Sequence, residues 1–507
     1  MRTAPLRHQL FTIDQRGILL RNWGLLFLLA LVAYSFTASR GPQWQDSGLH
    51  ILRVVTHEPV NSLGLALSHP LHHWFGRFAA ALSAFEPAFA VTLVSALFAA
   101  VAVANVFGCV FTVARRTSPA WIAALSVGLC HSHWQMATRA ETYTLVVAIL
   151  SAECWCLIAF ARSRRPEFLW LMAFFNGLGL ANHNFALLTT PVLLYAAISG
   201  TASMKNRPIT LFVCAFFWLS ASIPYTGLVI GQCLRSRDLA GTMQSALFGF
   251  GYRDEVLNTS ITVYGLLLCA GFMLLNFPNL TLLHSARGIV SGDRKSLPPL
   301  ARRGLLLGLT LHFLFVVRYP VVDQYMFFLP TYLYVSLFSG LGFAALTNRD
   351  IRRPDGRFFS LTVALLAATP VFYALAPAIA RRAGVLQAVA SNRPYRDDYI
   401  YLLTPWSRAE RSAEVMSAEA LRLAGDAGLI VVEDRSPEFA IRYRLLCGGF
   451  SKVELIRDTE TEAILAAAQA GRSIVLVPTR RSAPRAAPPL GVWRREGDLY
   501  RLSFSPE

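Results

Sequence analysis

The chain has 507 residues, of which 54% are hydrophobic and only 15% charged, and its formal net charge at pH 7 is +17. Apolar runs of about 16 to 25 residues recur along it, which excludes an ordinary soluble globule and indicates a polytopic membrane protein. The cations gather in short connections between apolar runs and not on one soluble face. We therefore interpret them as topology signals and expect no nucleic-acid partner.

Eleven membrane-spanning segments are predicted. The first, residues 19–37, follows Arg16, carries Arg21 near its start and lacks the small-residue cleavage site of a signal peptide, so we expect an uncleaved first helix with a cytoplasmic N-terminus. The others are expected at 87–114, 118–133, 143–161, 167–182, 184–200, 209–231, 259–282, 303–318, 325–346 and 358–379.

The basic residues alternate with these segments. The connections that this count places inside the cell carry runs of cations: Arg115, Arg116, Arg162, Arg164, Arg165, Lys205, Arg207, Arg287, Arg294, Lys295, Arg302, Arg303, Arg349, Arg352, Arg353 and Arg357. The opposite connections carry fewer: Arg40, Arg53, Arg77, Arg139, Arg235, Arg237, Arg253 and Arg318. This asymmetry predicts a multi-pass protein of the cell (inner) membrane with its C-terminal region outside the cytoplasm.

Two regions outside the spans have patterns of their own. The first outer loop, 39–86, is amphipathic and is expected to form helices along the membrane surface. After the last span, the apolar runs 429–432, 453–456 and 474–477 indicate buried strands, with a helix at 461–471. We therefore predict a transmembrane domain at residues 1–379 and a small extracytoplasmic α/β domain at 380–507.

Unusual polar residues collect at the outer ends of the predicted spans. Asp46 follows the first span within Gln45-Asp46-Ser47-Gly48. The later outer connections add Arg139, Glu141, His183, Arg318, Asp323 and Gln324. Carboxylates, an imidazole and arginines on one face are typical of a site where charge is handled.

Five of these residues also have a purely structural interpretation. Asp46 and Glu141 could stabilise the start of a helix, and Arg139 and Arg318 could be anchors that extend to the membrane surface. His183, between two asparagines, could be a hydrogen-bonded loop histidine.

Two groups of residues could suggest a metal site, but each has a simpler interpretation. His69, His72 and His73 have ligand-like spacing, but no carboxylate accompanies them, so we expect a solvated helix face. Asp397-Asp398 is expected at the surface of a polar linker. No metal site is predicted, and the need for a divalent ion stays open.

Five segments, in order, resemble the motifs of one family. They are Trp44-Gln45-Asp46-Ser47-Gly48, His69-Pro70 followed by Gly76-Arg77, Trp134 followed by residues 139–145, residues 177–183 and residues 323–330. The chain is similar to the multi-span family of protein O-mannosyltransferase-like enzymes with the C-type glycosyltransferase fold. It departs from the family pattern at Leu49, where the first-loop signature has glutamate, and at Leu71, where the second motif has a second proline.

The resemblance implies an all-α polytopic membrane fold and a polyprenyl-phosphate-linked sugar as donor. By the same resemblance Asp46 would be the catalytic base, and direct displacement at the anomeric carbon would invert its configuration. The substrate-binding residues would be His69, Arg139, Glu141, His183, Arg318, Asp323 and Gln324, with Arg139 or Arg318 on the phosphate.

Two alternatives remain: a transporter or flippase of lipid-linked saccharides, and a non-catalytic membrane scaffold. The identity of the sugar stays open, as does the acceptor, which could be a protein, lipid or glycan. Glu153, inside the fourth predicted span, is one of the few polar groups that a transport path could use.

Overall fold

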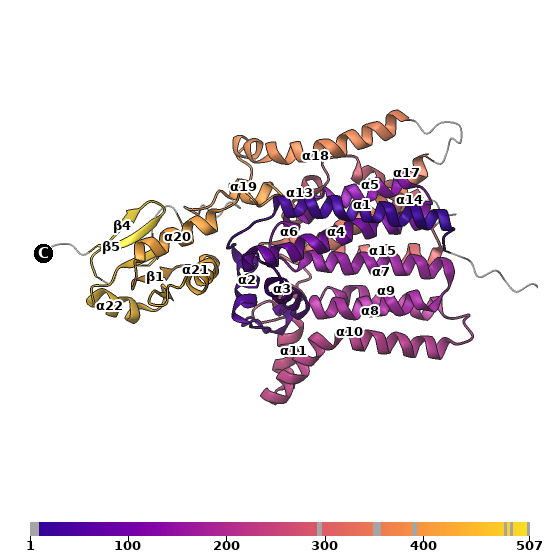
Figure 1. The fold of residues 1–507 in the computed structure, drawn as a ribbon. Helices are drawn as coiled ribbons and strands as arrows, with labels where there is room; N and C mark the ends of the chain where they lie inside the picture. The colour runs from indigo at the N-terminus through magenta and orange to yellow at the C-terminus, as the bar shows by residue number, and fades with distance from the viewer. Residues whose placement is uncertain are drawn as a thin grey trace, which may run out of the picture.

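The computed structural model describes residues 10–291, 297–347, 356–387, 393–480, 484–486 and 490–503. A bundle of long helices carries a small sheet domain at one end (Figure 1). The long helices and their main partners are α1 (Ile13–Thr37), α4 (Pro87–Ala114), α5 (Thr117–Gly128), α7 (Tyr143–Ser163), α8 (Pro166–Asn182), α9 (Ala186–Gly200), α10 (Arg207–Ser236), α13 (Val263–Asn276), α14 (Thr281–Ser291), α15 (Pro299–Val317), α17 (Leu329–Thr347) and α18 (Gly356–Arg382).

Helices occupy all eleven predicted segments, but the number of spans is not confirmed. Seven of the described helices are long and apolar enough to cross a membrane, or up to eight if the bent pair α13 and α14 is one span. Helix α5 has 12 residues, about 18 Å, which is shorter than the apolar core of a bilayer. The chain nevertheless has the multi-pass helical architecture that the composition indicated.

The predicted span at 259–282 is wrong in shape. Helices α13 and α14 meet at 110° instead of forming one straight helix. The break contains Pro278, which lacks an amide hydrogen and disfavours helix at the residue before it. Asn279 then accepts a hydrogen bond from the Thr281 amide (2.9 Å) at the start of α14.

The arginine-rich connections meet at one end of the bundle. The Arg115 side chain contacts Gln15, Arg116 donates to Thr347 Oγ1 (2.9 Å), and Arg164 donates to the Gly200 carbonyl (3.1 Å). The sheet domain lies at the other end (Figure 1). Several predicted topology residues lie outside the described part of the chain: Arg294, Lys295, Arg349, Arg352 and Arg353. Which end faces the cytoplasm stays a prediction.

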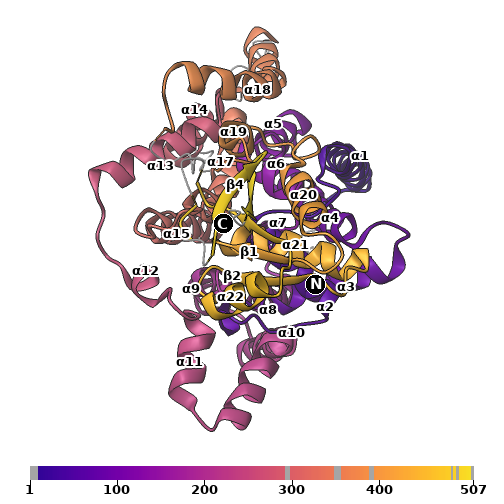
Figure 2. The same cartoon turned by 90° about the vertical axis from the view of Figure 1, so that its left-hand side faces the viewer.

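Short helices cover the end of the bundle that carries the sheet domain. The segment 39–86, predicted as the first outer loop, contains α2 (Gln45–Thr56), the 3₁₀ turn η1 (Leu65–Leu67) and α3 (Pro70–Leu82). The other connections contribute α6 (His131–Ala137), α11 (Leu239–Leu247), α12 (Arg253–Leu257) and α16 (Gln324–Phe327). Helices α11 and α12 run along the edge of the bundle from α10 to α13 (Figure 2).

The Glu153 carboxyl, whose partner the sequence did not reveal, is buried in the bundle. It accepts a hydrogen bond from the Asn176 side chain (3.2 Å), which also donates to Thr189 Oγ1 (2.7 Å). The group therefore belongs to a small polar network between α7, α8 and α9, which is how buried polar side chains in a membrane bundle are satisfied.

Two glycines allow α14 and α17 to touch through their backbones. A Cβ atom at Gly342 would lie 1.9 Å from the His284 carbonyl oxygen, and one at Gly288 would lie 2.0 Å from that of Phe338. A Gly342→Ala variant should therefore force the helices apart, at a cost of about 1–3 kcal/mol. Thermal unfolding of the purified protein in detergent measures the effect. Gly227→Ala is the control, because a Cβ atom there meets nothing within 4 Å and its unfolding midpoint should not fall.

The C-terminal region forms a five-stranded sheet in the order β2-β1-β3-β5-β4. Strands β1 (Leu429–Val432), β2 (Glu454–Arg457) and β3 (Ile474–Val477) are parallel, whereas β4 (Val492–Glu496) and β5 (Leu499–Ser503) form an antiparallel edge. The three predicted strands and the helix α22 (Thr461–Gln469) are confirmed; β4 and β5 were not predicted.

Both faces of this sheet are buried, which explains its uninterrupted apolar strands. Ile430 and Val432 pack under α20 (Ser412–Ala424) and α21 (Arg435–Gly448), while Leu429 and Val431 pack against α22. The proposed domain boundary at residue 380 stays a prediction; helix α18 ends at Arg382.

Candidate functional site

The Asp46 side chain lies in the first turn of α2, at the end of the bundle that faces the sheet domain. It is exposed, yet the surrounding protein displaces much of its water, and this dehydration raises its pKa. Ser47 and Gly48, the two residues that follow Asp46, are buried. The chain thus presents one accessible carboxylate on an otherwise packed helix start.

Glu141 is the second carboxylate of this site and is buried in the turn between α6 and α7. Its Oε1 atom accepts a hydrogen bond from Ser47 Oγ (2.5 Å), and its backbone both donates to and accepts from Ser95 Oγ (3.0 Å each). Its Oε2 atom has no hydrogen-bond partner among the described residues. Glu141 is therefore fixed directly beside the Asp46 turn, and one of its oxygen atoms is buried without a hydrogen-bond partner among the described residues.

Asp323 completes the group at the start of α16, where it is half-buried. Burial and the nearby Asp46 carboxylate raise its pKa to about 6. Burial, with the Asp46 and Asp323 carboxylates, raises the pKa of Glu141 to about 8. Like charges held together keep one of them protonated, so near neutral pH the cluster holds a protonated Glu141 beside ionisable Asp46 and Asp323.

A group of histidines lies next to the carboxylates. The His69 ring stacks on His183 with centroids 5.0 Å apart, and its Nδ1 atom is hydrogen-bonded to the Asn182 carbonyl (2.7 Å). Tyr143 contacts His183 (5.6 Å between centroids) and begins the helix that follows Glu141. The structure therefore brings Asp46, Glu141, His183, His69 and Asp323 into one connected region.

The expected solvated face at His69, His72 and His73 is wrong. All three side chains are buried, and His50 of α2 packs edge-on against the rings of His69 and His72. Burial lowers the pKa of His69 to about 4 and that of His72 to about 3, so the rings are neutral. Helix α2 covers this face of α3, which no local pattern could indicate. Within the described residues no three His, Cys, Asp or Glu side chains are grouped so as to hold a metal ion.

Arg318 and Gln324 hold backbone segments at the edge of the site through hydrogen bonds to carbonyl groups. Arg318 donates to the carbonyls of Val256 (2.6 Å) and Asn258 (2.5 Å), which fixes the end of α12. Gln324 Nε2 donates to the Val316 carbonyl (2.8 Å) and is buried. In this arrangement Gln324 holds a backbone turn, while Arg318 uses only its Nη1 atom on carbonyls.

Arg139 connects the site to the linker that leads to the sheet domain. It donates to the Tyr401 carbonyl (2.7 Å) and Ser407 Oγ (3.1 Å), and its guanidinium lies over the Tyr401 ring at 4.0 Å. Its Nη1 atom is buried without a partner among the described residues. Arg139 is thus a buried connector with one donor still available.

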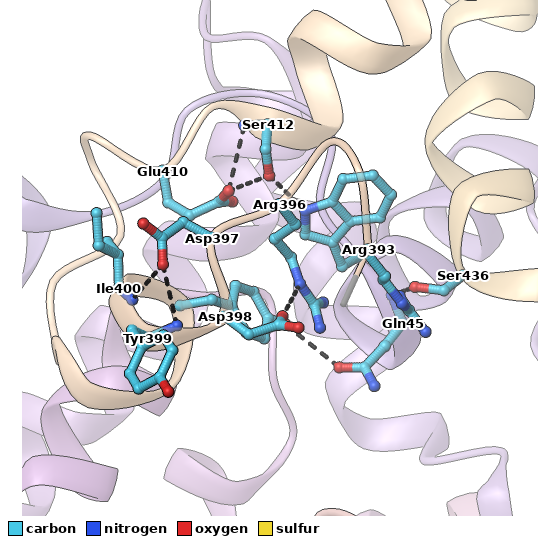
Figure 3. Close-up of polar contacts among 12 residues, drawn as sticks. Gln45, Arg393, Arg396, Asp397, Asp398, Tyr399, Ile400, Glu410, Ser412 and Ser436 are labelled. Atoms are coloured by element: carbon cyan, nitrogen blue, oxygen red, sulfur yellow. Dashed lines mark hydrogen bonds and ion pairs between the residues drawn. The ribbon is translucent and has the colours of Figure 1, made fainter. Parts of the chain in front are cut away.

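The sheet domain and the linker before it bind the two residues that precede Asp46. Trp44 is buried in the sheet domain's core, stacks on Tyr395 (centroids 5.0 Å apart) and donates from Nε1 to Ser412 Oγ (2.9 Å). The Gln45 amide donates to Ser436 Oγ (3.1 Å; Figure 3), and the Gln45 side chain accepts a hydrogen bond from the Tyr401 hydroxyl (3.3 Å). The position of α2 therefore depends on the C-terminal domain.

The linker beside this contact has an ion pair of its own. Arg396 pairs with Asp398 at 2.6 Å, and both side chains are 5% exposed, whereas Asp397 caps the helix α19 (Asp398–Leu403) through the amides of Tyr399 and Ile400 (Figure 3). The expectation that both aspartates lie at the surface is wrong for Asp398. Its pairing with Arg396 compensates the burial of charge.

Four residues near the cluster were missed. His50 lies four residues after Asp46, on the same face of α2, so helical spacing could have drawn attention to it. Ser47 directly follows Asp46, and no spacing indicates its hydrogen bond to Glu141. Tyr252 and Arg435 could not have been found, because they approach the cluster from distant segments. Burial and the Asp46 and Asp323 carboxylates raise the pKa of Tyr252, whereas the nearby Arg435 opposes this increase.

The chain is similar to known membrane glycosyltransferases in part of its sequence and in its fold. Residues 63–206 match the family model described as the protein O-mannosyl-transferase TMEM260 N-terminal domain. No curated protein matches the chain by sequence. The structure of ArnT from Cupriavidus metallidurans, bound to undecaprenyl phosphate, is similar at a TM-score of 0.55 and 13% identity, over 96% of this chain and 99% of that chain.

A second similar structure is the archaeal oligosaccharyltransferase AglB from Archaeoglobus fulgidus, in complex with an inhibitory peptide and a dolichol-phosphate. It has a TM-score of 0.48 and 12% identity, over 90% of this chain and 69% of that chain. The ArnT likeness extends over nearly the full length of both chains and confirms the predicted fold class. The chain is therefore a multi-pass membrane protein with the C-type glycosyltransferase fold, and its residues 63–206 match the N-terminal domain of the TMEM260 protein O-mannosyl-transferase family.

Proposed function

We propose that the protein is a glycosyltransferase that moves a sugar from a polyprenyl-phosphate carrier to a hydroxyl group outside the cytoplasm. The observation that carries the proposal is the cluster of Asp46, Glu141 and Asp323 at one end of a membrane bundle, with Asp46 accessible. The family match supports it, as does the undecaprenyl phosphate bound to ArnT. Mannose and a protein hydroxyl are the first donor sugar and acceptor to test.

In the proposed reaction Asp46 accepts the proton of the acceptor hydroxyl. The oxygen attacks the anomeric carbon as the bond from that carbon to the phosphate oxygen breaks, and the electron pair leaves with the polyprenyl phosphate. The products are the glycosylated acceptor, with inverted anomeric configuration, and the polyprenyl phosphate. Protonated Glu141 can donate a hydrogen bond from its unpartnered oxygen to the sugar or phosphate.

The departing phosphate needs positive charge close to it. Arg139 offers a buried, unpartnered Nη1 atom, and Arg318 has nitrogen atoms beyond the one bound to carbonyls. Arginine suits this task because its fork of donors matches phosphate oxygens. We propose that these two residues hold the phosphate and that His69, His183 and Asp323 position the sugar and acceptor. Gln324 would act indirectly, through the turn that it fixes.

The pH dependence of transfer should be bell-shaped. Activity should rise through about pH 6, as Asp323 loses its proton, and fall above about pH 8, as Glu141 ionises and repels the phosphate. The charged groups facing Glu141 are Asp46, Asp323 and Arg139. In Glu141→Gln the alkaline limb should disappear while the acid limb stays. Initial rates from pH 5 to 10 measure this, and an unchanged alkaline limb would assign it to another group.

The function is tested with purified protein in liposomes and radiolabelled polyprenyl-phosphate mannose, alongside other polyprenyl-phosphate sugars. Label transferred to a peptide, lipid or glycan acceptor supports the proposal and identifies the acceptor class. Movement of the labelled lipid between leaflets without transfer would instead support a flippase. Neither outcome, in protein that retains its fold, would favour the scaffold. Protease accessibility of the sheet domain in right-side-out vesicles tests the proposed extracytoplasmic orientation.

A further inference from the structure

A large cavity lies along the side of the bundle and includes none of the clustered carboxylates. Its volume is 1220 Å³. Helices α1 and α8 form its walls, and α4 and α7 form its floor, since α1 packs on α4 and α8 packs on α7. Nothing in the proposed reaction uses this space.

The cavity follows α7 for most of its length. Its lining on this helix extends from Leu145 to Ser163, which corresponds to about 27 Å, close to the thickness of a bilayer's apolar core. Small side chains at Ala148, Ala152 and Ala159 leave the floor open. Between its two ends the lining is apolar apart from Asn105, whose side chain is hydrogen-bonded to Trp23 and Ser151. The shape and this lining fit an extended hydrocarbon chain better than ordered water, which needs several polar partners.

The two ends of the cavity differ in charge. The end nearest the sheet domain is lined by apolar side chains such as Phe75, Phe98 and Leu178. The other end is lined by Arg16, Arg164, Arg165 and Glu167.

The three arginines at this end differ in their interactions with the protein. Arg164 donates to the Gly200 carbonyl, and Arg165 approaches Glu167 at 3.5 Å with both side chains about half exposed (59% and 48%). Arg16 is exposed. Three cations face one carboxylate, so the end is complementary to an anion. Basic pockets between transmembrane helices bind phosphate-bearing lipid headgroups in this way.

We propose that this groove binds an anionic phospholipid of the leaflet opposite the carboxylate site, with its phosphate at Arg16 and Arg165 and an acyl chain along α7. A polyprenyl-phosphate donor is the less suitable occupant. With its phosphate at these arginines, its sugar would be nearly a membrane thickness away from Asp46. The site is therefore distinct from the proposed donor site and stands independently of it.

The experiment uses full-length protein in detergent, titrated with dioleoylphosphatidylglycerol or dioleoylphosphatidylcholine, which have identical chains. Native mass spectrometry measures the bound lipid. We expect tighter binding of the glycerol lipid, reduced roughly fivefold for each arginine removed in Arg16→Gln and Arg165→Gln. Arg303→Gln is the matched control, because Arg303 is exposed at the same end of the bundle on α15 but does not line the groove.

Two further variants separate the headgroup from the chain. Glu167→Gln removes the carboxylate found among the described residues of the cavity lining and should strengthen binding of the anionic lipid. Ala152→Trp fills the floor and should weaken binding of both lipids. Equal binding of the two lipids by the wild type would overturn the proposal, as would undiminished binding by folded Ala152→Trp or stronger retention of undecaprenyl phosphate than of the glycerol lipid.

Discussion

Asp46→Asn is expected to lose sugar transfer by about 10²–10⁴-fold, the usual contribution of a general base. The amide has nearly the shape of the carboxylate but cannot accept the acceptor's proton at neutral pH. The loss should appear in kcat and persist at saturating donor, because the change removes a step of the reaction and not a binding contact. Initial rates with labelled donor measure it.

The fold should survive this substitution. The Asp46 side chain is exposed and contributes to α2 mainly as a negative charge in the first turn, an effect of about 0.3–1 kcal/mol. Asp254→Asn is the control, since Asp254 is an exposed first-turn carboxylate of α12 at the same end of the bundle. Near-normal transfer by Asp46→Asn would remove Asp46 from the role of base and leave Asp323 as the next carboxylate to test.

Trp44→Ala is expected to separate α2 from the sheet domain and to reduce activity without touching a reacting group. The side chain is 1% exposed, and deleting a buried tryptophan costs about 3–5 kcal/mol. It would lose the stacking on Tyr395 and the hydrogen bond to Ser412. Since Asp46 lies two residues away, the carboxylate should become less well positioned.

Hydrogen exchange distinguishes this local effect from global unfolding. In Trp44→Ala the amides of α2 and α21 should exchange faster, while those of α4 and α7 stay protected. Trp44→Phe, which keeps an aromatic ring but not the Nε1 donor, should recover part of the activity. Trp74→Ala is the control, because Trp74 lies in the same outer loop but is 51% exposed. Normal exchange and activity in Trp44→Ala would show that the sheet domain does not position Asp46.

The parts of the fold that were predicted depend on local patterns. Apolar runs marked the positions of the long helices, and uninterrupted apolar strands such as residues 429–432 marked a sheet buried on both faces. The bend between α13 and α14 was missed although Pro278 lies at the break, because prolines also occur within intact helices such as α18. Length and hydropathy alone do not distinguish a bent helix from a straight one.

The site was predicted only as a gathering of residues at one end of the bundle. That inference used the alternation of the predicted spans across the membrane, which places Asp46, Glu141, His183 and Asp323 on the same side. It says nothing about which of these side chains contact one another. The hydrogen bonds at the site join residues that are far apart in the sequence. Ser47 is hydrogen-bonded to Glu141, 94 positions later, and Trp44 to Ser412, 368 positions later. No spacing in the chain encodes such contacts.

The amino-acid sequence by itself determined the multi-pass helical architecture, the α/β nature of the C-terminal region and the residue types at one end of the helices. These features depend on hydropathy and charge over short stretches of the chain, so the linear pattern of residues is enough to predict them. Only the tertiary structure decided that His72 is buried, that Arg139 and Arg318 hold backbone carbonyls, and that Glu141 keeps its proton near neutral pH. Burial and the distance between charges determine these properties, and both arise only when distant segments pack together.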